Sequence, residues 1–167
     1  GSPDMIGGGE YTCFLNGNEN ACTPEMFVRY AQIAALMPVM QFSASPWRVL
    51  PEADFQKVKD ALALREKCLP EILKAVECAK VTGEPIVRSM EFVFPGQGME
   101  RVMDQFMVGE DLLVAPVWKQ GEVARSVRLP EGQWRCVGLG ETEGDVLNGG
   151  RDVILGENEG LVVLKRV

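Results

Sequence analysis

The pattern of hydrophobic and polar positions changes character twice along the chain. In the first third, two short apolar stretches, residues 3–6 and 39–43, lie on either side of a segment with helical spacing. That segment begins at Thr23, a residue type that caps helices, and Pro38 ends it. A strand, a helix and a strand in this order predict parallel pairing of the two strands.

The middle third has a helical period. A helix is predicted over residues 52–82, and Gly83 with Pro85 forms a typical helix end. Pro70 interrupts the pattern, which predicts a kink or two abutting helices. The apolar positions that recur at helical spacing are Phe55, Val58, Leu62, Leu69, Ile72, Leu73, Val76 and Ala79.

The last half consists of short stretches rich in Val and Leu, separated by turn residues, which is typical of an antiparallel β-sandwich. The segment 156–160 is predicted to be a five-residue hairpin loop. Helical periodicity stops near Gly83, so the predicted domains are residues 1–84 and 85–167. The predicted strands are Ile86–Phe94, Asp111–Trp118, Val123–Leu129, Gln133–Val137, Asp152–Leu155 and Leu161–Lys165.

The first of these domains is too small to stand alone. Two parallel strands and two helices cannot cover their own sheet edges or bury both faces of the sheet. The predicted fold class is therefore α+β, with the last β/α units of an eightfold β/α (TIM) barrel followed by an antiparallel sandwich. We expect the open strand edges to be covered by the remaining barrel of a parent chain or by self-association.

Charge and composition exclude several functions. The chain of 167 residues has a formal net charge of -7, and no stretch concentrates Lys and Arg. Binding to nucleic acid or to an anionic membrane surface needs such a basic region, so neither partner is expected. The absence of His excludes nucleophilic catalysis that uses an imidazole base, and the usual zinc and non-haem iron sites. No metal and no organic cofactor is indicated.

The five Cys residues form no Cys-x-x-Cys pair. Cys68 and Cys78 fall on one predicted helix about 15 Å apart, too far for a disulfide. Reduced, buried thiols in a cytoplasmic protein are the favoured interpretation, and a bridge between Cys13 and Cys22 is the alternative. The sequence shows no apolar run long enough to span a membrane and no signal-peptide pattern.

Six segments, in the same order, resemble motifs of glycoside hydrolase family 31. The most specific is the run from Asp104 to Val117, which is similar to the signature of the family's C-terminal sandwich. The other five are Asp4–Gly8, Phe27–Gln32, Pro38–Ser43, Leu64–Pro85 and Arg125–Trp134. The resemblance implies that the parent protein is a retaining α-glycosidase acting on α-linked glucosides or related α-glycosides.

The family mechanism uses one Asp as nucleophile and a second as acid/base. The resemblance places both on earlier barrel strands, upstream of Asp4. It therefore implies a fragment with no catalytic residue of its own, inactive alone. Many family members have Arg and His where this chain has Gln41 and Ser43, and this difference implies another sugar preference or a reshaped pocket.

The resemblance and the strand pattern together give five candidate substrate-binding residues. Asp4 falls where a barrel strand ends, although an Asp can also bond to its own glycine turn. Gln41 and Ser43 alternate with a Phe and share one strand face. Trp47 and Arg48 are suited to stack on and clamp a sugar ring, or to anchor their loop.

Other polar and aromatic positions are assigned structural roles. Glu10 is predicted to be a loop carboxylate, and Asp104 with Gln105 a structural turn. Trp118 and Trp134 are predicted to be core or surface aromatics of the sandwich. A second hypothesis remains: a non-catalytic carbohydrate-binding or interaction module that binds sugar on an exposed aromatic face of the sandwich.

Overall fold

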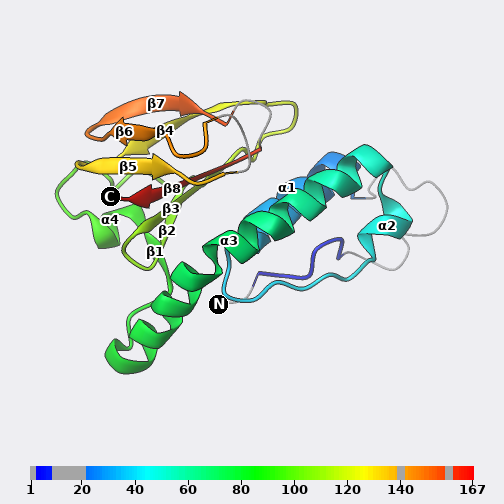
Figure 1. Ribbon diagram of the computed structural model, residues 1–167, viewed down its shortest axis with the longest axis horizontal. Coiled ribbons are helices and arrows are strands. Elements are labelled where there is room, and N and C mark those ends of the chain that lie inside the picture. Colours follow the sequence, from blue (N-terminus) through cyan, green and yellow to red (C-terminus); the bar gives the residue numbers. More distant parts are fainter. Residues whose placement is uncertain (1–2, 9–21, 139–141, 157–159) are drawn as a thin grey trace.

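The computed structural model describes residues 3–8, 22–138, 142–156 and 160–167, which form a helical part and a β part (Figure 1). Glu10, Cys13 and most of the predicted 156–160 loop lie outside the described residues. The helices are α1 (Pro24–Ala35), α2 (Pro46–Val49), α3 (Glu52–Thr82) and α4 (Met90–Val93). The strands are β1 (Val87–Ser89), β2 (Phe106–Val108), β3 (Leu112–Pro116), β4 (Arg125–Leu129), β5 (Gln133–Cys136), β6 (Val146–Asn148), β7 (Arg151–Leu155) and β8 (Leu161–Arg166).

Helix α1 begins at Pro24, where the sequence predicts, and ends at Ala35, three residues before Pro38. The Thr23 side chain accepts a hydrogen bond from the Met26 amide at 3.2 Å, which satisfies one of the free N–H groups of the first turn. The helix packs along α3, and Figure 1 shows the two side by side. Their contact is a small core to which Phe27, Val28 and Val58 contribute, together with Ile6.

Helix α3 is continuous through Pro70, so of the two predicted alternatives the pair of abutting helices is wrong, and the kink stays a prediction. Proline costs this helix one backbone hydrogen bond, and burial of one helix face on both sides of Pro70 offsets that loss. Three of the apolar residues named in the sequence pattern, Leu62, Leu69 and Leu73, are instead exposed. The buried face consists of Val58, Ala61, Leu64, Cys68, Ile72 and Ala75.

The predicted parallel pairing is present as one bridge, between Ile6 and Phe42. The Ile6 amide donates to the Gln41 carbonyl and the Ser43 amide to the Ile6 carbonyl, both at 2.8 Å. Beyond this bridge the stretch 39–43 does not form a strand, so the prediction of a strand there is wrong. A parallel pair gains little without further neighbours, so the pairing stays short.

The β part contains two antiparallel sheets. One has six strands in the order β1-β2-β3-β8-β5-β6, and the other pairs β4 with β7. Side chains from both sheets, among them Leu113, Val127 and Trp134, form one hydrophobic cluster. Strands β2 and β6 were not predicted, and the predicted strand 86–94 ends at Ser89, whose side chain caps α4.

The predicted hairpin over 156–160 is wrong. Strand β7 pairs with β4, whereas β8 pairs with β3 and β5. The chain therefore passes from one sheet to the other here. A loop of hairpin length between two apolar runs does not determine whether the runs pair with each other, because the pairing depends on which sheet buries each strand.

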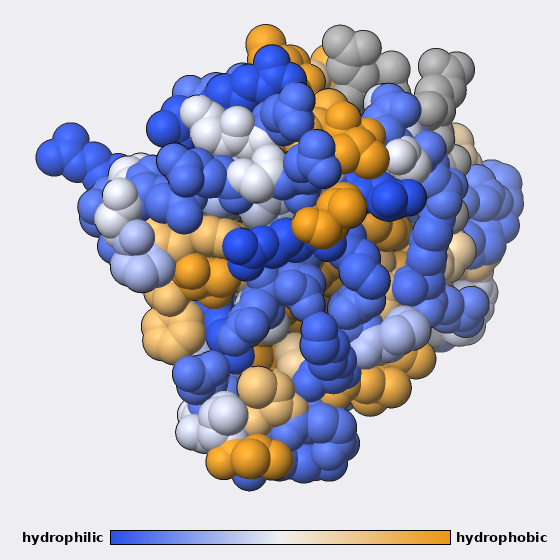
Figure 2. Space-filling view, turned by 60° about the vertical axis from the view of Figure 1, so that its left-hand side comes forward, coloured by the Kyte–Doolittle hydropathy of each residue, from blue (hydrophilic) through white to orange (hydrophobic). Residues whose placement is uncertain are grey.

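The helical part and the β part share a hydrophobic core. The buried face of α3 from Ala61 to Ala75 packs with Val108 of β2, Leu112 and Val114 of β3, and Val163 of β8 in one cluster, which we call the shared core. Figure 2 shows a mostly hydrophilic face with separate hydrophobic patches. None of the described helices is long and apolar enough to cross a membrane.

The four described cysteines, Cys22, Cys68, Cys78 and Cys136, are free thiols. The alternative of a bridge to Cys22 is therefore not realised. Cys68 lies in the shared core, where burial raises the pKa of its thiol from 9.0 to about 11.

Cys68 should therefore resist alkylation. At pH 8 its thiolate fraction should be about 100-fold below that of an unshifted thiol, in addition to its poor access. Mass mapping after iodoacetamide treatment of the native chain should find Cys78, which is partly exposed, modified much faster. Equal rates at the two residues would contradict the buried position of Cys68.

Candidate functional site

The predicted substrate-binding residues lie around the Ile6–Phe42 bridge. Phe42 points into the small core under α1, so Gln41 and Ser43 face the other way, and both are exposed. Asp4 is also exposed and stands two residues before Ile6. The backbone pairing thus brings three of the five predicted residues to one region of the surface.

Asp4 is held by its own turn. Its Oδ1 accepts a hydrogen bond from the Met5 amide at 2.7 Å, and the Gly8 amide closes the turn on the Met5 carbonyl at 2.9 Å. The Asp4 carbonyl accepts a hydrogen bond from the Tyr30 hydroxyl of α1. Desolvation and the Asp4 charge both raise the pKa of Tyr30, so the phenol stays a donor. The remaining Asp4 oxygen is free to accept from a ligand.

Trp47 and Arg48 lie on α2, directly after the bridge. The Trp47 side chain is 67% exposed and its ring contacts Phe55 of α3 edge-on, with centroids 6.5 Å apart. Arg48 is exposed. Within the described ranges, no hydrogen bond, ion pair or ring contact joins either residue to Asp4, Gln41 or Ser43, so the structure does not assemble all five into one pocket.

Arg65 of α3 contacts the same region and was not predicted. Its Nη1 donates to the carbonyls of Ala35 and Met37, each at 2.6 Å, and its Nη2 donates to the carbonyl of Pro38 at 3.2 Å. Partial burial lowers the pKa of the guanidinium. A charged residue beside Leu64, on a helix face that packs inward, was the signal available in the sequence.

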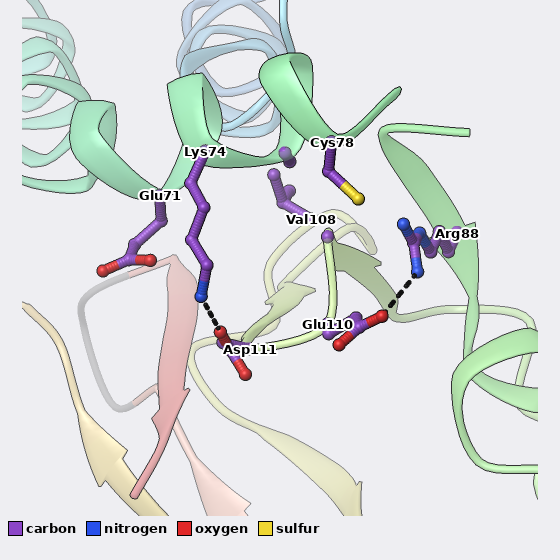
Figure 3. A pocket seen from close by; sticks show the side chains of 9 residues that line it. Glu71, Lys74, Cys78, Arg88, Val108, Glu110 and Asp111 are labelled. Atoms are coloured by element: carbon purple, nitrogen blue, oxygen red, sulfur yellow. Dashed lines mark hydrogen bonds and ion pairs between the residues drawn. The ribbon is translucent and has the colours of Figure 1, made fainter. Parts of the chain in front are cut away.

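A small polar pocket lies where α3 meets the start of the β part (Figure 3). Lys74 Nζ pairs with an Asp111 oxygen at 2.6 Å, and the buried Arg88 pairs with Glu84 at 3.0 Å and Glu110 at 3.5 Å. The Asp111 hydrogen bond raises the pKa of Lys74. The volume of about 50 Å³ admits a few water molecules only. Its charges satisfy one another, so it is not a substrate site.

A larger cleft of about 560 Å³ lies between α1, the start of α3 and the β part. Arg29 Nη2 donates to the Glu122 carbonyl at 2.7 Å, and Glu25 accepts from the Gly121 amide at 2.8 Å. Gly160 has a φ of +71°, and a Cβ there would lie 2.1 Å from Arg29 Nη1. We call this arrangement the α1 contact, and it ties the helix to the second half of the chain.

Comparison with known proteins identifies the family. The sequence model described as "Glycosyl hydrolase family 31 C-terminal domain" matches residues 83–153. The mouse protein named "Myogenesis-regulating glycosidase" is 38% identical over 136 residues, which is 80% of this chain and 19% of that protein. The chain belongs to glycosyl hydrolase family 31. It forms part of the C-terminal portion of such a protein.

Other family 31 relatives agree. An α-glucosidase of Saccharolobus solfataricus is 30% identical over 132 residues, covering 75% of this chain and 18% of that protein. The solved structure of a family 31 α-xylosidase from a soil metagenome, complexed with xylose, has a TM-score of 0.77 and 28% identity, and covers 97% of this chain and 27% of the xylosidase. A Flavobacterium johnsoniae dextranase complexed with isomaltotriose has a TM-score of 0.72 and 27% identity, covering 86% of this chain and 18% of the dextranase.

This family 31 chain thus spans about a fifth of the length of the curated relatives it matches. The likeness to the α-xylosidase includes the helical part, which lies before the region of the family model. The mixed helical and antiparallel fold is therefore that of family 31 glycosidases. Within the described ranges, no group of three or more acidic or Cys side chains is placed to hold a metal ion.

Proposed function

We propose that this chain forms the end of the catalytic barrel of a family 31 α-glycosidase, together with the sandwich that follows it. Residues 1–84 are the last β/α units of the barrel, and residues 85–167 are the sandwich. The chain supplies substrate-binding residues, whereas the nucleophile and the acid/base come from earlier barrel strands. The substrates of the whole protein are α-linked glycosides or oligosaccharides.

The observation that carries this proposal is the parallel bridge between Ile6 and Phe42 across α1. A strand, a crossover helix and a parallel neighbour form the repeating unit of a β/α barrel. Helix α3 then follows as the helix of the next unit. Both paired segments lack further neighbours within the described residues, which is what the end of a sheet cut from a closed barrel would show.

The exposed groups at the bridge suit a sugar. The Gln41 amide and the Ser43 hydroxyl each offer a donor and an acceptor, and Asp4 offers a carboxylate, as hydroxyl recognition requires. Trp47 presents an indole face for stacking, and Arg48 a guanidinium fork. Loops after the carboxyl ends of barrel strands form the active site in this type of fold. Ser43 ends the second of the two segments, and Trp47 lies after it.

The partner of the helical part is the rest of the barrel. Met5 and Val39, next to the bridge, are 39% and 50% exposed, and Trp47 adds a third exposed hydrophobic side chain. Further strands of the parent chain would cover these side chains and complete the hydrogen bonding of the sheet. Light scattering tests whether the rest of the barrel covers this surface. A dimer of the 167-residue chain would indicate that self-association covers it instead.

Activity assays test the proposed function directly. A panel of nitrophenyl α-glycosides should release nitrophenol with a family 31 chain extended upstream through the earlier strands, and not with the 167-residue chain alone. The best substrate of the longer chain identifies the sugar. Reproducible turnover by the short chain would contradict the proposal, and Asp4 and Glu10 would then be the first carboxylates to replace.

A further inference from the structure

Arg65 occupies an unusual place for a charged side chain. It follows Leu64 on the inward-facing side of α3, and it is partly buried. Its guanidinium takes part in none of the ion pairs of the described residues and bonds instead to the three backbone carbonyls of Ala35, Met37 and Pro38. A planar group with five N–H donors can serve several acceptors at once, which an ammonium on a flexible stem does less well.

The three carbonyls lie between the end of α1 and the bridge. The last carbonyls of a helix have no partner within the helix and bear partial negative charge, so a cation is favoured there. Two backbone hydrogen bonds also hold this turn: the Leu36 amide donates to the Ile33 carbonyl at 3.3 Å, and the Met37 amide donates to the Ala34 carbonyl at 3.0 Å. Three residues after Pro38, the chain reaches Gln41.

We propose that Arg65 is a positioning residue for the sugar-binding segment Gln41–Ser43. That the segment binds sugar rests on the proposed function. That Arg65 positions the segment rests on its three hydrogen bonds. Arg65 touches no ligand itself. It fixes the direction in which the chain leaves α1, so that Gln41 and Ser43 meet Ile6 in register and turn their side chains to the exposed face.

Amide hydrogen exchange of the 167-residue chain tests the positioning role without any sugar. The Ile6 and Ser43 amides are hydrogen-bonded across the bridge, so their exchange reports whether the segment is held. In Arg65→Ala their exchange should accelerate by about 10-fold or more, because loss of charge-assisted hydrogen bonds weakens the segment. The amides of β3 and β8 should be unaffected. Unchanged exchange at Ile6 and Ser43 would overturn the proposal.

Two further variants keep the test decisive. Arg65→Lys keeps the charge and should restore part of the protection, and it replaces the alanine variant if that variant does not fold. Lys80→Ala is the matched control, since Lys80 on the same helix pairs with Glu77 on the exposed side. If the Ile6 and Ser43 amides exchange as fast in Lys80→Ala as in Arg65→Ala, the substitutions act on α3 in general. That result would also overturn the proposal.

The upstream-extended chain tests the consequence for sugar binding. With nitrophenyl α-glycosides, Arg65→Ala should lower kcat/KM by about 10- to 100-fold, since small displacements of contact residues have effects of this size. The loss in the double variant with Ser43→Ala should be less than the product of the two single losses. An unchanged kcat/KM would overturn the role in sugar binding. No turnover by the unsubstituted longer chain would reject the proposed function, and the exchange experiment would still decide the role of Arg65.

Discussion

Replacing Trp134 by alanine should lower the free energy of unfolding by about 3–5 kcal/mol. The side chain is fully buried between the two sheets, and its ring meets Phe94 edge-on with centroids 5.8 Å apart. The indole Nε1 donates to the Pro130 carbonyl at 2.9 Å. The substitution therefore leaves a large cavity and also removes one of the two donors to the Pro130 carbonyl, which keeps the Gly150 amide at 3.2 Å. Urea unfolding followed by circular dichroism measures the loss.

Two variants control this prediction. Trp118 is 56% exposed, so Trp118→Ala should change the unfolding free energy by less than about 0.5 kcal/mol. Trp134→Phe keeps most of the volume and loses the indole hydrogen bond, and it should fall between the two alanine variants. Similar midpoints for Trp134→Ala and Trp118→Ala would mean that the two sheets do not pack around Trp134.

Replacing Arg125 by alanine should destabilise the β part by about 3–5 kcal/mol, because each buried carbonyl left without its donor costs about 1–3 kcal/mol. Arg125 is 8% exposed. Its Nη1 donates to the Asp104 carbonyl at 2.5 Å and to the Pro116 carbonyl at 2.8 Å, and its Nη2 pairs with the Asp104 carboxylate at 2.6 Å. Its Nε also donates to the Ser126 carbonyl at 3.2 Å, so the substitution removes a donor from three carbonyls, and this costs more than the loss of the ion pair itself.

The comparison with Asp104→Asn separates these contributions. The Asp104 side chain is 47% exposed, so water replaces the lost charge, and the cost should be about 1 kcal/mol or less. Thermal unfolding of both variants, with the amide exchange of β4, measures the difference. If Asp104→Asn is as destabilising as Arg125→Ala, the ion pair rather than the carbonyl contacts of Arg125 stabilises this turn.

The β part could be predicted in outline from the sequence. Short stretches rich in Val and Leu, separated by turn residues, identified β3, β4, β5, β7 and β8. Asp104 and Gln105 were predicted to form a structural turn. Both side chains make structural contacts, Gln105 with the backbone N–H and carbonyl of Arg128 and Asp104 with the Arg125 guanidinium. Strand β6 was missed because it is three residues long and largely exposed.

The failures come from tertiary contacts. Local geometry at a proline inside a helix predicts a kink or two abutting helices, and the buried residues on both sides of Pro70 keep α3 one continuous helix. The loop 156–160 has hairpin length, but β7 and β8 belong to different sheets because their partners lie far away in the sequence. Local pattern contains neither kind of information.

In the candidate site, too, local pattern predicted some features and tertiary contacts decided the others. Strand periodicity indicated that Gln41 and Ser43 share a face, and the structure has both exposed beside Ile6. The spacing gave no sign that Arg65 holds the preceding turn, since its three partners are main-chain carbonyls 27 to 30 residues away. Every residue has a backbone carbonyl, so the amino-acid sequence does not indicate which carbonyls Arg65 contacts. Only the three-dimensional structure shows contacts of this type.

The shared core limits how such proteins can be recombined. Gly83 separates helical from β sequence, and a chimera of two family 31 proteins would most simply be joined there. That junction would combine the Leu64–Ala75 face of one parent with the Val108, Leu112 and Val163 surface of the other, inside a single cluster. Interior packing tolerates few mismatches in volume. Exchanges that keep α3 and the sheet from the same parent should therefore yield far more soluble protein than exchanges at Gly83.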